Sequence, residues 1–85
     1  MSVPNPQMSS DLLGELVHEK TIDYLEQYHS KQLPTDIYRR IIEEIEQTLF
    51  TSTMKYTFGN QSKAALYLGI NRATLRTKLK RHDLL

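Results

Sequence analysis

Gly69 stands between two short segments that each have the marks of a helix, and it strongly constrains how the last third of the chain can fold. Glycine readily adopts the left-handed conformation that a tight helix-to-helix turn requires. Before this glycine, Asn60 can cap a helix by accepting a hydrogen bond from a free N–H group of the first turn, and after it Asn71 can cap a second helix. We therefore predict a helix-turn-helix unit over residues 59–81.

The apolar residues of this unit indicate which sides of its helices face inward. In the first helix Ala64 and Ala65 are small enough for a second helix to approach closely, and Leu66 and Leu68 are expected to supply apolar contacts. In the second helix Leu75 and Leu79 stand four residues apart, so they share one face and point inward with Ile70. The outer arc of the second helix is left to Ala73, Thr74, Thr77, Lys78, Lys80 and Arg81.

The two parts of the chain carry opposite charge, which the formal net charge of +1 conceals. Residues 60–85 hold six Lys and Arg against one Asp, a net charge of +5, whereas residues 1–59 hold five basic and nine acidic residues, a net charge of −4. A basic outer face on a short helix suits the major groove of duplex DNA, and an acidic remainder would orient the approach. Double-stranded DNA is thus the first partner to consider.

Two longer helices are predicted upstream, so the chain is expected to be all-α with four helices. The first should begin near Ser9 or Ser10, after a mobile tail, and the second should follow a cap at Thr35 and run to about Thr57. One face of the first is formed by Leu12, Leu13, Leu16, Val17, Tyr24 and Tyr28. We accordingly divide the chain into a tail (1–9), a helical dimerisation core (10–58) and a DNA-binding unit (59–85).

The long second helix has more apolar surface than one chain of 85 residues can cover. In its second half the apolar residues Leu49, Phe50 and Met54 lie on a different side of the helix from those of the first half, so this helix should pack against two neighbouring elements. Association of two copies would cover the rest, and a self-contained four-helix monomer is the alternative. The predicted dimer core consists of Ile37, Tyr38, Ile41, Ile42, Ile45 and Leu49.

The sequence offers no constellation typical of catalysis or of metal binding. It has no cysteine, no nucleophile motif and no glycine-rich phosphate loop, and its single Glu15-x-x-His18 pair lacks the second copy that a di-iron site needs. His29 and His82 are expected at the surface. No apolar stretch approaches the roughly 20 residues that span a bilayer. We expect a soluble, cytoplasmic protein that is not an enzyme and uses no cofactor or metal.

The segment Gly-Asn-Gln-Ser-Lys-Ala-Ala-Leu-Tyr-Leu-Gly-Ile-Asn-Arg-Ala-Thr-Leu-Arg-Thr-Lys-Leu-Lys-Arg, residues 59–81, resembles the C-terminal helix-turn-helix of the bacterial factor for inversion stimulation (Fis) family. A weaker resemblance continues upstream through residues 36–47 and 54–57. It implies an intertwined homodimer whose long central helices cross. It also implies a bacterial, nucleoid-associated protein that binds and bends DNA with low sequence specificity and regulates transcription.

Individual DNA contacts follow from geometry and from this resemblance. Arg72 opens the second helix of the unit, where an arginine can make a bidentate contact with guanine, and the resemblance places Asn71 and Arg72 at base edges. Thr77 stands where family members carry a lysine that approaches bases, so the direct readout there should be altered. Contacts to the DNA backbone are expected from Asn60, Ser62, Lys63, Thr74, Arg76, Lys78, Lys80 and Arg81.

Other departures from the family concern its partners. The resemblance makes RNA polymerase a candidate partner, at positions matching Lys55, Phe58, Gly59 and Gln61, but Phe58 replaces a basic residue. Thr48 replaces a proline in the long helix, so any kink there should be smaller or absent. Nothing before Ser10 resembles the hairpin arms that stimulate DNA invertases, and we expect no such stimulation.

Two alternatives remain open on the sequence. One is the detached DNA-binding end of an NtrC-type transcription activator, whose C-terminal helix-turn-helix is similar. The other is a dimer that binds no DNA and whose basic helix binds an acidic protein partner.

Overall fold

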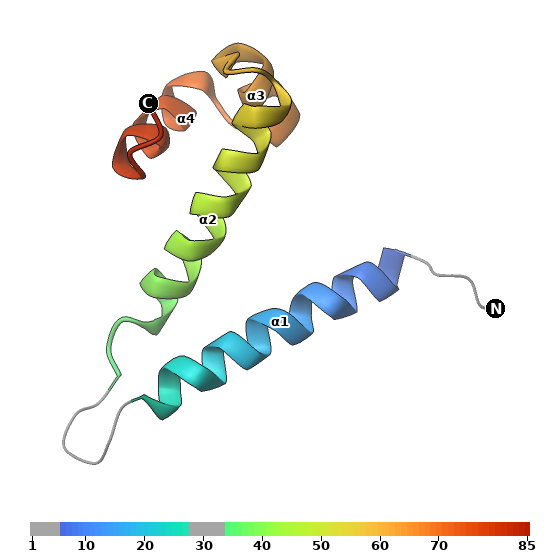
Figure 1. Cartoon of the computed structure of the whole chain (residues 1–85), viewed down its shortest axis with the longest axis vertical. Coiled ribbons are helices and arrows are strands. Elements are labelled where there is room, and N and C mark those ends of the chain that lie inside the picture. The colour runs from blue at the N-terminus through green and yellow to red at the C-terminus, as the bar shows by residue number, and fades with distance from the viewer. Residues whose placement is uncertain (1–5, 28–33) are drawn as a thin grey trace. The chain divides into compact units, whose positions relative to one another are not determined.

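The computed structural model describes residues 6–27 and 34–85, and the described chain is all-α (Figure 1). Its four helices are α1 (Pro6–Glu26), α2 (Ile37–Tyr56), α3 (Gln61–Leu68) and α4 (Arg72–Arg81). The all-α prediction is confirmed, and α2 matches its predicted extent closely. Thr48 lies within α2, which continues through it as one helix. Among the described residues, none of the helices combines the length and the hydrophobicity that a membrane-spanning helix needs.

Helix α1 begins earlier than predicted, at Pro6 rather than near Ser9 or Ser10. Proline is well suited to the first position of a helix because its φ angle is already helical and its missing N–H would have had no partner there. Residues 6–9, which the sequence analysis assigned to a tail, therefore belong to the helix. The predictions for Tyr28 and His29 lie outside the described residues.

The chain divides into two compact units, residues 1–42 and residues 43–85. In the first unit Tyr24 of α1 is buried, whereas Leu12, Leu13 and Leu16 of the same helix are each more than half exposed. The guanidinium carbon of Arg40 lies 4.1 Å from the centroid of the Tyr24 ring, a cation–π distance. Tyr24 therefore anchors α1, whereas the described residues leave Leu12, Leu13 and Leu16 on the predicted leucine face largely uncovered.

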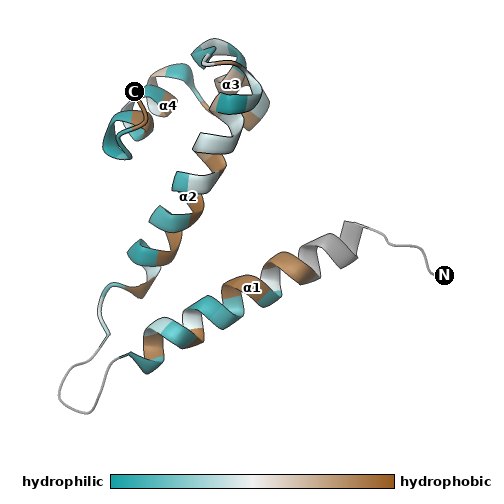
Figure 2. Ribbon diagram, viewed as in Figure 1, coloured by the Kyte–Doolittle hydropathy of each residue, from teal (hydrophilic) through white to brown (hydrophobic). Residues whose placement is uncertain are grey.

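The second unit combines the end of α2 with α3 and α4 around one small core. Phe50 of α2, the alanines of α3 and the leucines of α4 are buried together, and partly buried Met54, Leu68, Ile70 and Leu84 pack against them. Figure 2 shows hydrophobic residues following α2 along its length. This core agrees with the prediction that α2 packs against more than one neighbour. The prediction that Leu66 supplies apolar contacts is wrong, because Leu66 is 74% exposed.

Leu66 points outward because α3 packs against its neighbours with the side that carries its alanines, and Leu66 lies on the other side. Ala64 and Ala65 bring α3 close to its neighbours, so the residue that follows them on the helix turns toward solvent. Leu68 lies further round and reaches the core. The helix-turn-helix is thus held by small residues on α3 and by large ones on α2 and α4.

Candidate nucleic-acid interface

The loop that leads into α3 sets the start of the helix-turn-helix. Phe58 and Gly59 both have positive φ angles, 53° and 81°, and the Gly59 N–H donates to the Met54 carbonyl at 2.9 Å. Asn60 then caps α3, since its Oδ1 accepts a hydrogen bond from the Lys63 N–H at 2.9 Å. The predicted cap at Asn60 is confirmed.

The turn between α3 and α4 has the predicted geometry. Gly69 is left-handed, with a φ of 74°, and its N–H donates to the Ala65 carbonyl at 2.9 Å. The Ile70 N–H reaches the same carbonyl at 3.1 Å, which closes the end of α3. Asn71 caps α4 by accepting from the Ala73 N–H at 2.7 Å and from the Thr74 N–H at 3.3 Å. Two asparagines and one glycine thus define both helix starts and the turn.

Helix α4 has one buried and one exposed side. Leu75 and Leu79 are completely buried, as predicted. Their burial turns the opposite side outward, and positions 73, 74, 77, 80 and 81 share that side at helical spacing. All the residues predicted to touch bases are exposed, and so are most of those predicted to touch the DNA backbone: Asn60, Ser62, Lys63, Asn71, Arg72, Thr74, Arg76, Thr77, Lys80 and Arg81.

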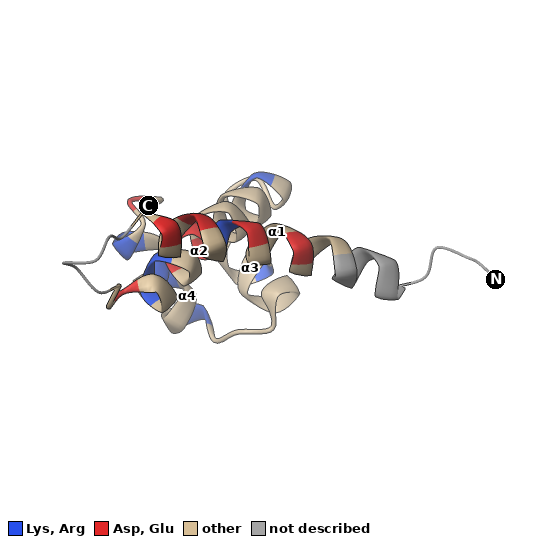
Figure 3. Cartoon of the chain, turned by 90° about the horizontal axis from the view of Figure 1, so that it is seen from below, with Lys and Arg blue, Asp and Glu red and all other residues tan. Residues whose placement is uncertain are grey.

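The cations of this unit fall into two groups. Lys63, Arg72 and Lys80 form no ion pair with any residue that the structure describes. Lys78 and Arg81, by contrast, pair with carboxylates of α2: Lys78 Nζ lies 3.1 Å from Glu46 Oε2, and Arg81 Nη2 lies 3.0 Å from Glu43 Oε2. Figure 3 marks basic residues on α4 and acidic residues on α1 and α2.

Arg76 is a separate case. Its Nη1 makes a long contact, 3.5 Å, with the side-chain oxygen of Gln61 at the start of α3. This contact joins the first and second helices of the unit on its exposed side. Arg76 is exposed, and its only polar side-chain contact among the described residues is this long one with Gln61. It therefore belongs neither to the cations without a partner nor to the cations in ion pairs.

His82 is largely buried, although a surface position was predicted for it. Its side chain is only 7% exposed, its Nε2 lies 3.0 Å from Glu46 Oε1, and its ring meets the Phe50 ring edge to face. The surface prediction is wrong because the chain turns after α4 and brings His82 against α2. The hydrogen bond from His82 and the charge of Lys78 lower the pKa of Glu46 below its usual 4.5, although partial burial opposes them.

Comparison with known proteins identifies the family. The model of a family described as "Bacterial regulatory protein, Fis family" matches residues 41–82. Proteins named "DNA-binding protein Fis" from Yersinia enterocolitica, Enterobacter sp. and Vibrio cholerae are each 38% identical over 78 residues, covering 92% of this chain and 79% of theirs. The chain belongs to the Fis family. Because the match to Fis proteins extends well upstream of the helix-turn-helix, it favours Fis over an NtrC-type activator.

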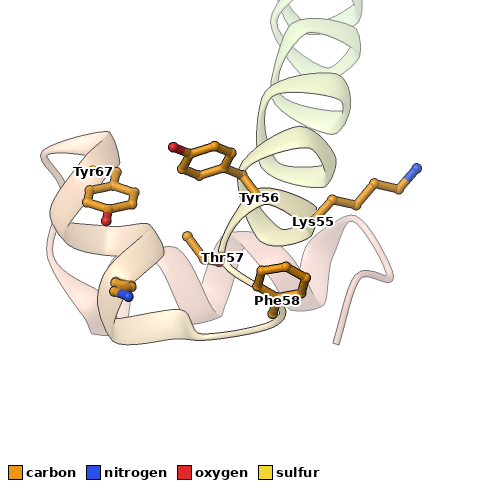
Figure 4. Close-up of a pocket in the computed structure, with 6 residues that line it drawn as sticks. Lys55, Tyr56, Thr57, Phe58 and Tyr67 are labelled. Carbon is orange, nitrogen blue, oxygen red and sulfur yellow. The ribbon is translucent and has the colours of Figure 1, made fainter.

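The Fis-family chain also carries an aromatic corner, which we define as Tyr56, Phe58 and Tyr67. Phe58 is 97% exposed, and the rings of Tyr56 and Tyr67 meet edge to face with centroids 6.1 Å apart. With Lys55, Thr57 and Lys63 these residues line a hollow of about 470 Å³ (Figure 4). Lys55, Phe58, Gly59 and Gln61, the candidate polymerase contacts, lie on or beside this corner.

Within residues 12–27 and 34–85, no group of His, Asp and Glu side chains converges to hold a metal ion. The Glu15 and His18 pair lies on the exposed surface of α1.

Proposed function

We propose that this protein binds double-stranded DNA by placing α4 in the major groove. The observation that carries the proposal is the two-sidedness of α4: its leucines are buried, whereas its cap Asn71 and all its cations except Lys78 are exposed. A short helix presented in this way can enter the groove with its N-terminal residues at base edges. The relatives named DNA-binding protein Fis support the same conclusion.

Each exposed residue then has a role. Arg72, with Asn71 beside it, reads base edges, and Thr77 approaches the bases without the charge that family members carry there. Asn60, Ser62, Lys63, Thr74, Arg76 and Lys80 contact the DNA backbone, which positions the protein and specifies little. With few base readers and several cations, affinity comes mainly from phosphates, and the protein acts as a regulator of low sequence specificity.

We further propose that the protein works as a homodimer with crossed α2 helices. Within the single chain Tyr38, Ile45 and Leu49 of the predicted dimer core are exposed, as are the leucines of α1, whereas Ile41 is buried and Ile37 and Ile42 are partly buried. An apolar surface of this extent favours a second copy. In a dimer two α4 helices enter successive major grooves, and the duplex bends to reach both, as suits a nucleoid-associated protein of the bacterial cytoplasm.

Salt-dependent binding to random duplex DNA tests the proposal. The logarithm of the binding constant should fall linearly and steeply with the logarithm of salt concentration, because each neutralised phosphate releases counterions. Light scattering on the same sample should give the mass of a dimer. Binding that is absent on duplex DNA, while an acidic protein partner is bound, would instead support the protein-interaction alternative.

RNA polymerase is a second proposed partner, and the aromatic corner favours it. Its three aromatic residues are all exposed, and a contiguous exposed apolar patch of this kind marks a surface that a protein partner covers. A polymerase contact at Phe58 would be apolar rather than ionic. Phe58→Ala should then reduce promoter activation in a purified transcription assay without changing DNA affinity. Equal activation by both proteins would remove this role.

A further inference from the structure

Three side chains join the end of α4 to the middle of α2, and we call them the Glu46 clasp: Glu46, Lys78 and His82. Both oxygens of Glu46 are used, one by Lys78 Nζ at 3.1 Å and the other by His82 Nε2 at 3.0 Å. The Glu46 and His82 side chains are 17% and 7% exposed. Phe50, one turn along α2, supports the His82 ring, whose centroid lies 5.9 Å from its own.

The clasp stands apart from the outward-facing cations of α4. A lysine that contacts DNA must present its ammonium group to a phosphate, but the ammonium group of Lys78 is directed at a partly buried carboxylate of its own chain. Withdrawing Lys78 from Glu46 would leave one oxygen of this partly buried carboxylate without its cation, which is unfavourable. Lys80, two residues further along α4, has no such competing partner among the described residues.

We infer that Lys78 is a positioning residue, which with His82 and Glu46 sets the orientation of α4 on α2, and is not a phosphate contact. This inference rests on the proposed DNA-binding function and deepens it, because it separates the cations that touch DNA from the one that holds the recognition helix. Arg81 and Glu43 reinforce the clasp from a more exposed position one turn nearer the start of α2. Exposed pairs of this kind contribute less than shielded ones.

Because the clasp fixes α4 to α2, it affects how α4 is placed on DNA. Helix α2 is the helix proposed to cross its counterpart in the dimer, so the angle between α2 and α4 sets where the two recognition helices lie along the duplex. A loosened clasp would keep every phosphate-binding cation on α4 but would let the orientation of α4 on α2 vary. Affinity would fall because binding must then fix that orientation, while the number of phosphates neutralised in the complex stayed the same.

The salt dependence of binding distinguishes the two roles. We would compare the wild-type protein with Lys78→Met and with the matched control Lys80→Met, measuring fluorescence anisotropy on one duplex at several salt concentrations. Each lost phosphate contact lowers the log-log slope by about 0.9, so Lys80→Met should lower it by about 2 per dimer. Lys78→Met should weaken binding with an unchanged slope, and Lys78→Arg should restore it. A slope reduced equally by both methionine variants would overturn the inference.

Glu46→Gln provides an independent test with opposite expectations for the two roles. If Glu46 merely withheld Lys78 from a phosphate, the glutamine variant would free the lysine and increase both affinity and slope. If Glu46 positions α4, affinity should fall. Circular dichroism would establish that each variant is folded. A wild-type protein that fails to bind duplex DNA would defeat the proposed function itself, whereas an increased affinity of Glu46→Gln would overturn only the positioning role.

Discussion

The rings of Phe50 and His82 meet edge to face, with centroids 5.9 Å apart and planes inclined by 66°. Phe50 lies in the middle of α2, and His82 follows the last turn of α4. The same histidine contacts Glu46, so α2 supports the end of α4 by an apolar and a polar contact one turn apart. The long helix is therefore part of the helix-turn-helix unit as well as its connection to the remainder of the chain.

Phe50→Ala should lower the free energy of unfolding by about 3–5 kcal/mol, because it removes a large buried ring from a small core. Urea denaturation followed by circular dichroism measures this change. Phe58→Ala is the matched control, since the Phe58 ring is exposed and its loss should alter stability by no more than about 0.5 kcal/mol. Similar losses from the two substitutions would contradict the packing described here.

Gly69→Ala should cost about 1–2 kcal/mol through backbone strain alone. The φ angle of Gly69 is 74°, but among the described residues no atom beyond its two chain neighbours lies within 4 Å of the position that a Cβ would take, so the added methyl meets no steric obstacle. Gly69→Asn should cost less, because asparagine tolerates the left-handed conformation. Thermal unfolding of both variants checks this order, and an equal loss for the two would point to a steric cause instead.

Asn71 should separate helix capping from DNA contact. Asn71→Ala removes the acceptor for the Ala73 and Thr74 N–H groups and should cost about 1 kcal/mol of stability. Asn71→Asp keeps an acceptor at the helix start and should retain stability, yet its negative charge should weaken binding to DNA phosphates. Parallel unfolding and anisotropy measurements test both expectations. Undiminished DNA affinity in the aspartate variant would place Asn71 away from the duplex.

Glu46 should contribute to the change in the free energy of unfolding with pH. Because its pKa in the folded chain is lowered from 4.5, the folded state favours the charged carboxylate, and the resulting stabilisation is fully present above pH 4.5. It is lost as the pH falls through the lowered value. Urea titrations between pH 3 and pH 6 should therefore show a shallower acid loss for Glu46→Gln than for the wild-type chain. If the free energy of unfolding fell equally with pH in both proteins, the contacts of Glu46 with His82 and Lys78 would not stabilise its charged form.

Arg72 and Lys80 should differ in how they affect sequence preference. Arg72→Ala should reduce the preference for guanine at the edges of the binding site by about 1–3 kcal/mol, because a bidentate contact to one base is lost. Lys80→Ala should weaken all sequences alike, since a phosphate is present at every position. Competition assays with a set of duplexes that differ at those edges measure both effects. Uniform losses for Arg72→Ala would remove it as a base reader.

Residues near one another in sequence determined the local features of the helix-turn-helix. The caps at Asn60 and Asn71 depend on N–H groups two or three residues away, and the turn depends on the left-handed preference of Gly69 itself. The burial of Leu75 and Leu79 follows from their spacing on one helix face. Interactions of such short range need no knowledge of the remainder of the fold, and they were predicted correctly.

Only the tertiary structure decided which cations of α4 are paired with a carboxylate and which are exposed without such a pair among the described residues. Lys78, Arg81 and His82 have partners 32, 38 and 36 residues earlier in the chain, and no local pattern pairs them with particular carboxylates. The outward turn of Leu66 also depends on which neighbours α3 meets. The sequence by itself determined that a basic helix-turn-helix forms. The packing of that unit against α2 decided which of its charges remain available to a partner, because an ion pair forms only where the fold brings its two charges within reach.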